Sequence, residues 1–235
     1  MAFVLGGLAK GLIGGGLPSI VVPVMAMVVD PALAAAVTLV PVAATNIWQA
    51  LDGRLLLPVL RRFWPFLSTL FIGILGDSQL LATLPGPMTT LLIGVTVAAL
   101  SPLALSSHHF FVSRERERFV NPIAGSVIGV LGGITVIFTP ALIYLATLRL
   151  EKNLHVTCAA VMAVVSMVPL YLGLGFSAAL TWETVRFSVV LLVPTAAGYV
   201  LARNLRGKVS QREFQLILAA SLALIGIGLV AKSKT

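Results

Sequence analysis

The chain consists largely of apolar segments that recur along its whole length. Crossing the hydrocarbon core of a bilayer takes about 20 apolar residues, and eight segments are close to that length or longer. They are Ala2–Val29, Pro31–Leu51, Phe63–Leu84, Pro87–Phe111, Asn121–Thr147, Val156–Ala179, Val185–Ala202 and Phe214–Ala231. Charged residues make up only 10% of the chain, against about 25% in a soluble domain. We therefore expect an all-α polytopic membrane protein.

The basic residues stand mostly in the short gaps between these segments. Sixteen Lys and Arg against eight Asp and Glu give a net charge of +8. This placement is typical of the positive-inside rule and not of nucleic-acid binding. The single cysteine, Cys158, lies inside an apolar segment, and no metal or cofactor motif is present in the sequence. The expected partners are the lipid bilayer and a small solute, and a homo-oligomer stays open.

Glycines interrupt the first and the fifth apolar segments near their middles. Gly15-Gly16 precedes Pro23 as Gly132-Gly133 precedes Pro140, and the two motifs are 117 positions apart (140 − 23). This spacing predicts an internal duplication into repeats 1–118 and 119–235. Gly/Pro-interrupted segments in corresponding positions of two halves are the usual pointer to a transporter's binding site.

The distribution of charge favours one membrane topology. If all eight segments cross, nine basic residues lie on one side and six on the other. If the two interrupted segments dip in and return, the division becomes twelve against three, which is the stronger bias. We therefore predict six crossings and two re-entrant segments. Each repeat then crosses three times, so the repeats are inverted, although broken helices that cross remain an alternative.

A broken helix leaves backbone N–H groups exposed where it restarts, and these groups attract anions. Pro18-Ser19 suits such a restart, because proline fits the first helical turn and serine can cap it. Thr135 is predicted to do the same in the second repeat. The interruptions themselves contribute Gly14, Gly15, Gly16, Gly132 and Gly133. Two positive helix ends would then meet at the midplane, unless the glycines only allow helices to pack closely.

Polar side chains within the apolar segments are few. Lys10 is ionisable, and a charge at that depth costs about 2.5–3.5 kcal/mol, so it is a candidate to pair with an anion unless it snorkels to the interface. Asn46 and Gln49 share one helical face and can donate hydrogen bonds to oxyanions, or can join helices instead. The remaining polar site candidates are Thr38, Thr45 and Ser166.

The acidic residues near the membrane lie at segment edges, as Asp30, Asp77 and Glu183 do. We therefore expect no buried carboxylate and no proton coupling through one. Potential-driven export of an anion needs no coupling residue, since the gain is about 2.3 kcal/mol per charge per 100 mV. No nucleophile and base stand in a recognisable arrangement, so we do not expect an enzyme.

Two motifs connect the chain with a known family. Gly6–Pro18 (GGLAKGLIGGGLP), followed by Val22-Pro23, resembles the sulfite exporter TauE/SafE family, and Pro41–Gln49 (PVAATNIWQ) resembles the next segment in one branch. The resemblance implies two homologous halves and export of sulfite or organosulfonates such as sulfoacetate from a bacterial inner membrane. An anion channel, or a carrier of small carboxylates or other sulfur oxyanions, is the alternative. Gly132-Gly133-Ile134 departs from the pattern because it lacks a third glycine.

Overall fold

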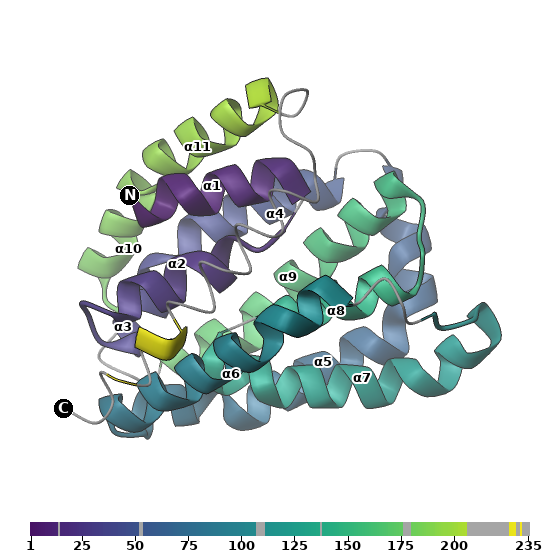
Figure 1. Cartoon of the computed structure of the whole chain (residues 1–235), viewed down its shortest axis with the longest axis horizontal. Coiled ribbons are helices and arrows are strands. Elements are labelled where there is room, and N and C mark those ends of the chain that lie inside the picture. The colour runs from purple at the N-terminus through teal and green to yellow at the C-terminus, as the bar shows by residue number, and fades with distance from the viewer. Residues whose placement is uncertain are drawn as a thin grey trace.

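The computed structural model describes residues 1–13, 15–51, 54–106, 111–136, 138–175, 180–205, 226–228 and 231. Within these ranges the regular elements are all helices, arranged as Figure 1 shows. They are α1 (Ala2–Ile13), α2 (Leu17–Ala26), α3 (Pro31–Val37), α4 (Leu39–Leu51), α5 (Leu56–Thr83), α6 (Gly86–Ser106), α7 (Arg114–Thr135), α8 (Thr139–Thr147), α9 (Lys152–Gly175), α10 (Trp182–Val190) and α11 (Leu192–Leu205). Gly14 and most of the predicted segment Phe214–Ala231 lie outside the described residues.

Four stretches of helix are long and apolar enough to cross a membrane. They are Leu56–Gln79, Arg114–Thr135, Asn153–Gly175 and Trp182–Ala202. The pair α3 and α4, bent by 45° at Thr38, makes a fifth if it counts as one crossing. Among the described residues, three of these stretches match predicted crossings and the bent pair matches a fourth, while α6 is apolar over a shorter length. The remaining stretch, Arg114–Thr135, overlaps a segment that was predicted to re-enter, and it is long enough to cross. The prediction of an all-helical, multi-pass membrane protein is confirmed.

The first apolar segment folds back on itself as two short helices. α1 and α2 contain 12 and 10 residues, and Gly16 between them has a φ of 86°, in the left-handed region. A Cβ on Gly6 of α1 would collide with the side chain of Val21 in α2. The two helices therefore lie side by side, as the prediction of a dip and return requires.

The fifth segment also folds back, but its break lies elsewhere than predicted. α7 is 22 residues long and α8 only nine, so the expected pair of half-helices of similar length is wrong here. The backbone N–H of Val112, just before α7, donates to the carbonyl of Thr147 at the end of α8 over 3.1 Å. Val136, the residue that follows α7, has a φ of 58°, in the left-handed region.

Gly132, Gly133 and Thr135 consequently belong to the last turns of α7 and not to a helix restart. A Cβ on Gly133 would press on the backbone of Ile74 in α5, so this glycine allows two helices to approach. The hydroxyl of Thr135 donates to the carbonyl of Leu131 over 2.6 Å, which is bonding back within its own helix. The restart is set instead by Pro140 in the first turn of α8.

Three pairs of helix boundaries recur at a spacing that differs from that of the two glycine motifs. α1 and α7 end at Ile13 and Thr135, α2 and α8 begin at Leu17 and Thr139, and α5 and α11 end at Thr83 and Leu205. Each pair is 122 positions apart (135 − 13, 139 − 17, 205 − 83), five more than the motif spacing gave. In this register Gly7 and Gly11 correspond to Gly129 and Gly133, and Pro18 corresponds to Pro140.

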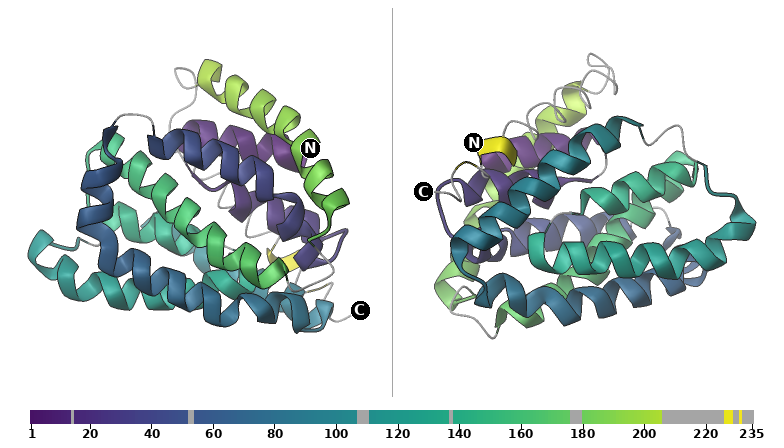
Figure 2. Two further views of the ribbon diagram at one scale, coloured as in Figure 1. Left: turned by 180° about the vertical axis from the view of Figure 1, so that it is seen from behind. Right: turned by 60° about the horizontal axis from the view of Figure 1, so that its bottom comes forward.

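The first helix of each half packs against the other half. α1 packs along α11, where a Cβ on Gly7 would strike the backbone of Thr195. α7 packs along α5, where a Cβ on Gly129 would strike the backbone of Leu70. Figure 1 shows the first pair along the upper edge and the second along the lower edge, and Figure 2 shows the same pairing from two other sides. α4 and α9 pack against each other between them.

Candidate functional site

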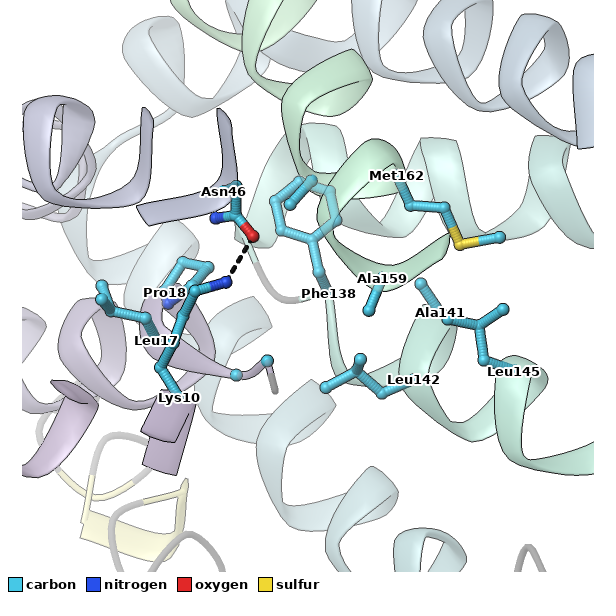
Figure 3. Close-up of a pocket in the computed structure, with 13 residues that line it drawn as sticks. Lys10, Leu17, Pro18, Asn46, Phe138, Ala141, Leu142, Leu145, Ala159 and Met162 are labelled. Atoms are coloured by element: carbon cyan, nitrogen blue, oxygen red, sulfur yellow. Dashed lines mark hydrogen bonds between the residues drawn. The ribbon is translucent and has the colours of Figure 1, made fainter. Parts of the chain in front are cut away.

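A small cavity lies where the two broken segments approach each other (Figure 3). Its volume is about 30 Å³, which is room for about two water molecules. The first half contributes Lys10, Gly15, Gly16, Leu17, Pro18 and Asn46. The second half contributes Phe138, Ala141, Leu142, Leu145, Ala159, Met162 and Ala163. The cavity is thus formed jointly by α1, α2 and α4 on one side and by α8 and α9 on the other.

Lys10 is the one ionisable side chain among the lining residues of this cavity, and only 1% of its surface is exposed. Its Nζ donates to Asn46 Oδ1 over 2.5 Å and to Gln49 Oε1 over 2.7 Å. Both acceptors are neutral amides on one face of α4, as their spacing predicted, and Asn46 Nδ2 donates in turn to the carbonyl of Val42 over 2.8 Å. The alternative that Lys10 snorkels to the interface is wrong, because the side chain points into the protein.

The start of α2 brings a second source of positive potential to the cavity. The N-cap is Gly16, which offers no side chain to the first-turn N–H groups, and Pro18 follows in that turn. Those groups have no acceptor within the helix and carry the positive end of its dipole. Ser19, in the same turn, is buried and its Oγ has no hydrogen-bond partner in the structure. The glycine is required because its left-handed φ disfavours any residue with a Cβ.

The start of α8 reaches the same cavity from the other half. Its N-cap residue, Phe138, supplies no side-chain hydrogen bond, and Pro140 lies in its first turn. Phe138, Ala141 and Leu142 all line the cavity. Two uncapped helix starts therefore meet there, as expected, although the second begins six residues after Gly133 (139 − 133).

Several predicted site residues lie away from the cavity. The hydroxyl of Thr38 donates to the carbonyl of Ala35 over 2.7 Å at the bend between α3 and α4. Those of Thr45 and Ser166 donate to carbonyls four residues earlier in their own helices. Such bonds satisfy a hydroxyl inside an apolar segment. The predicted residues that do not line the cavity are Ser19, Thr38, Thr45, Gln49, Gly132, Gly133, Thr135 and Ser166. Of these, Gln49 is connected to the cavity through its hydrogen bond with Lys10. Ser19 directly follows Pro18, which is a lining residue.

The apolar wall contributed by the second half was not predicted from the sequence. Ala159, Met162 and Ala163 share one face of α9, but such spacing marks any buried helix face. A second omission is Glu117, which is 5% exposed, so the expectation of no buried carboxylate is wrong. Its partner is Arg62 of α5, at 2.5 Å. The arginine-rich stretch around Glu117 concealed this pair, because it indicated a solvated loop.

Several membrane-crossing helices around a cavity at two broken helices constitute the architecture of a membrane transporter. The family of the sulfite exporter TauE/SafE matches residues 1–229 of the chain. The protein therefore belongs to the sulfite exporter TauE/SafE family, a family of transporters and not of enzymes. The comparisons with curated proteins and with solved structures gave no match. The resemblance noted in Gly6–Pro18 and Pro41–Gln49 thus extends over nearly the whole chain.

Proposed function

We propose that the protein exports a small sulfur oxyanion, sulfite or a short organosulfonate, across the bacterial inner membrane. The observation that supports this most directly is the buried ammonium of Lys10 at a cavity shared by both halves. A lysine within the apolar part of a membrane protein marks a substrate pathway by default. Two of its partners are neutral amides, and these orient the ammonium.

The local electrostatics favour an oxyanion over a cation or a neutral solute. The positive end of the α2 dipole and the ammonium of Lys10 both act on the same small volume. Backbone N–H groups near Gly16–Ser19 would donate to oxyanion oxygens, and Asn46 and Gln49 would hold the ammonium toward them. In Figure 3 the labelled residues of α8 and α9 face this polar group from the opposite side. Such a wall suits the carbon part of an organic sulfonate.

We propose that transport proceeds by alternating access between two inverted repeats. The cavity of about 30 Å³ is too small for a hydrated oxyanion, so the structure corresponds to a closed state and substrate entry needs movement. The crossed pairs α1–α11 and α5–α7 support a two-fold relation between the repeats. Because α7 begins at Arg114, we place the boundary between the repeats just before that helix and not at residue 118.

The direction of transport follows from charge. With the arginine-rich loops in the cytoplasm, an anion moves outward with the membrane potential, which contributes about 2.3 kcal/mol per charge per 100 mV. Export of a monoanion then needs no coupled proton. An anion channel would use the same site, but its flux would not saturate.

Transport in proteoliposomes tests the proposal. Saturable flux of labelled sulfite or sulfoacetate, above that of acetate, is the expected result, and non-saturating flux would indicate a channel instead. Asn46→Ala removes one acceptor of the Lys10 ammonium and should raise the half-saturation constant on the order of tenfold. The matched control is Asn153→Ala, since Asn153 is exposed in the first turn of α9. Equal half-saturation constants for the two variants would show that Asn46 is not part of the site.

A further inference from the structure

A buried ion pair joins the two halves at some distance from the cavity. Arg62 of α5 donates from Nε to Glu117 Oε2 over 2.9 Å and from Nη2 to Oε1 over 2.5 Å. The side chain of Glu117 is 7% exposed and that of Arg62 is 24% exposed. The pair therefore has one side turned toward the surroundings and one side turned into the protein. This two-point geometry is the strong form of a guanidinium–carboxylate interaction.

A short chain of contacts leads from this pair to the cavity. Asn121 follows Glu117 by one helical turn on the same face of α7, and its Oδ1 accepts from the hydroxyl of Tyr144 over 2.6 Å. Tyr144 precedes Leu145 in α8, and Leu145 lines the cavity. The tyrosine ring also stacks on Phe66, one turn after Arg62 in α5, with 5.3 Å between the ring centres. Asn121 and Tyr144 thus connect the helix that carries Glu117 with the helix that forms one wall of the cavity.

On its other side the pair faces the most basic end of the described chain. The exposed arginines near the ends of helices here are Arg54, Arg61, Arg114, Arg116, Arg118 and Arg149. The start of α7 and the end of α8 are tied together, since Val112 bonds to Thr147 and the guanidinium of Arg149 lies 5.0 Å from the ring centre of Phe111. Exposed Glu115 and Glu151 stand among these arginines, so this arginine-rich mouth has an excess of positive charge, and such an excess raises the local concentration of anions.

The chemistry of the pair matches that of the proposed substrate. A sulfonate, a sulfite or a carboxylate presents two oxygens that a guanidinium binds side by side, as it binds Glu117 here. A buried ion pair is weak evidence for a purely stabilising role, because apolar residues of similar volume often do as well. We propose that Arg62 is an entry site for the substrate anion, occupied by the Glu117 carboxylate when no anion is bound.

This inference rests on the proposed function and adds a step to it. An anion drawn to the arginine-rich mouth displaces the carboxylate, binds Arg62, and passes by Asn121 and Tyr144 to Lys10. The exchange keeps the guanidinium paired with one anionic group throughout, whereas the released Glu117 carboxylate, now 7% exposed, has to turn toward the arginine-rich side and water. Substrate reaches the Arg62 site only from the arginine-rich side of the membrane. A site in the central cavity would instead affect transport from both sides.

The test measures half-saturation constants from each side of oriented proteoliposomes with labelled sulfoacetate. Glu117→Gln removes the competing carboxylate and should lower the constant several-fold on the arginine-rich side. The double variant Arg62→Gln with Glu117→Gln keeps a neutral pair of similar shape, and should raise that constant on the order of tenfold. The constant from the opposite side should stay within about twofold in both variants.

The matched control is Arg186→Gln, which removes the same charge from an exposed position on α10, a helix that contributes none of the six arginines. It should shift the constant less than twofold at physiological salt, where exposed charges are screened. Equal shifts from both sides, or a change in maximal rate alone, would show that the pair is only a structural link and would overturn the inference. Absence of saturable transport in the unmodified protein would instead contradict the proposed function itself.

Discussion

The two breaks in the helices have the same form and different chemistry. Both join a first helix to a short second helix with a proline in its first turn, and both have a residue in the left-handed region. In the register of 122 positions, Gly16 of the first break corresponds to Phe138 of the second, and Lys10 corresponds to Gly132. Asn46 likewise corresponds to Val168. One half therefore carries the charge and the other half carries an apolar wall.

This difference between the two breaks fits the asymmetric substrate proposed above. The backbone arrangement that brings two helix starts to one cavity is present twice, whereas the side chains that bind a charged group are present once. A substrate with an anionic head and a short carbon body would place the head near Lys10 and the body near Met162. Inorganic sulfite would use the polar side alone.

The largest expected effect comes from removing the charge of Lys10, for which the second half has no counterpart. Lys10→Met keeps the length and apolar stem of the side chain but deletes charge-assisted hydrogen bonds worth about 1.5–3 kcal/mol each. We expect transport efficiency to fall by about a hundredfold or more, measured as initial flux in proteoliposomes. Gly132, its counterpart, contributes no charge. Transport by Lys10→Met at the unmodified rate would contradict the functional asymmetry of the two breaks.

A smaller effect is expected at the left-handed residue of the first break. Gly16→Ala places a Cβ on a residue with a φ of 86°, which costs about 1–2 kcal/mol. The strain should lower the Tm in detergent and shift the start of α2, so flux should fall as well. Gly76→Ala is a suitable control, since a Cβ at Gly76 meets no atom within 4 Å and its φ is not left-handed.

At the left-handed residue of the second break, effects of opposite sign should offset each other. Val136 has a φ of 58° although it carries a β-branched side chain. Val136→Gly relieves this strain, of about 1–2 kcal/mol, but loses the packing of a side chain that is 1% exposed and gains entropy in the unfolded chain. We expect a net change in stability within about 1 kcal/mol, measured as the Tm. A loss as large as that of Gly16→Ala would show that the two breaks are not equivalent in strain.

The smallest effect is expected at a polar residue of the first half that does not line the cavity. Thr45 donates only to backbone carbonyls of its own helix, at 2.7 Å and 3.4 Å. Thr45→Ala should leave flux within about twofold and change stability by less than about 0.5 kcal/mol. A loss of flux comparable with that of Asn46→Ala would place Thr45 in the site after all.

Polar site residues within apolar segments could be predicted from the sequence, whereas apolar site residues could not. Lys10, Asn46 and Gln49 stood out because polar groups are costly in apolar segments, and the structure joins all three. Phe138 and Met162 gave no signal, since an apolar residue in an apolar segment has no distinguishing feature. Glu117 was missed because burial of an acidic residue depends on a partner 55 positions away.

The position of the second break illustrates a different limit. Gly132-Gly133 matched the first motif in letters, but glycine serves both helix breaks and close helix packing. Only the contact of Gly133 with α5 distinguishes the two uses. The fold class and the first hairpin depended on local composition and were predictable, whereas the register between the halves depended on tertiary contact.

The crossed pairing of helices also governs how the protein is made. α1 is among the first parts of the chain to be synthesised, yet the helix it packs along, α11, begins at Leu192. At about 5–20 residues per second, roughly ten to forty seconds pass before Thr195 can meet Gly7. During that time the glycine face of α1 must rest against lipid or a chaperone in the membrane. Assembly of the first helix is therefore delayed until α11 has been synthesised.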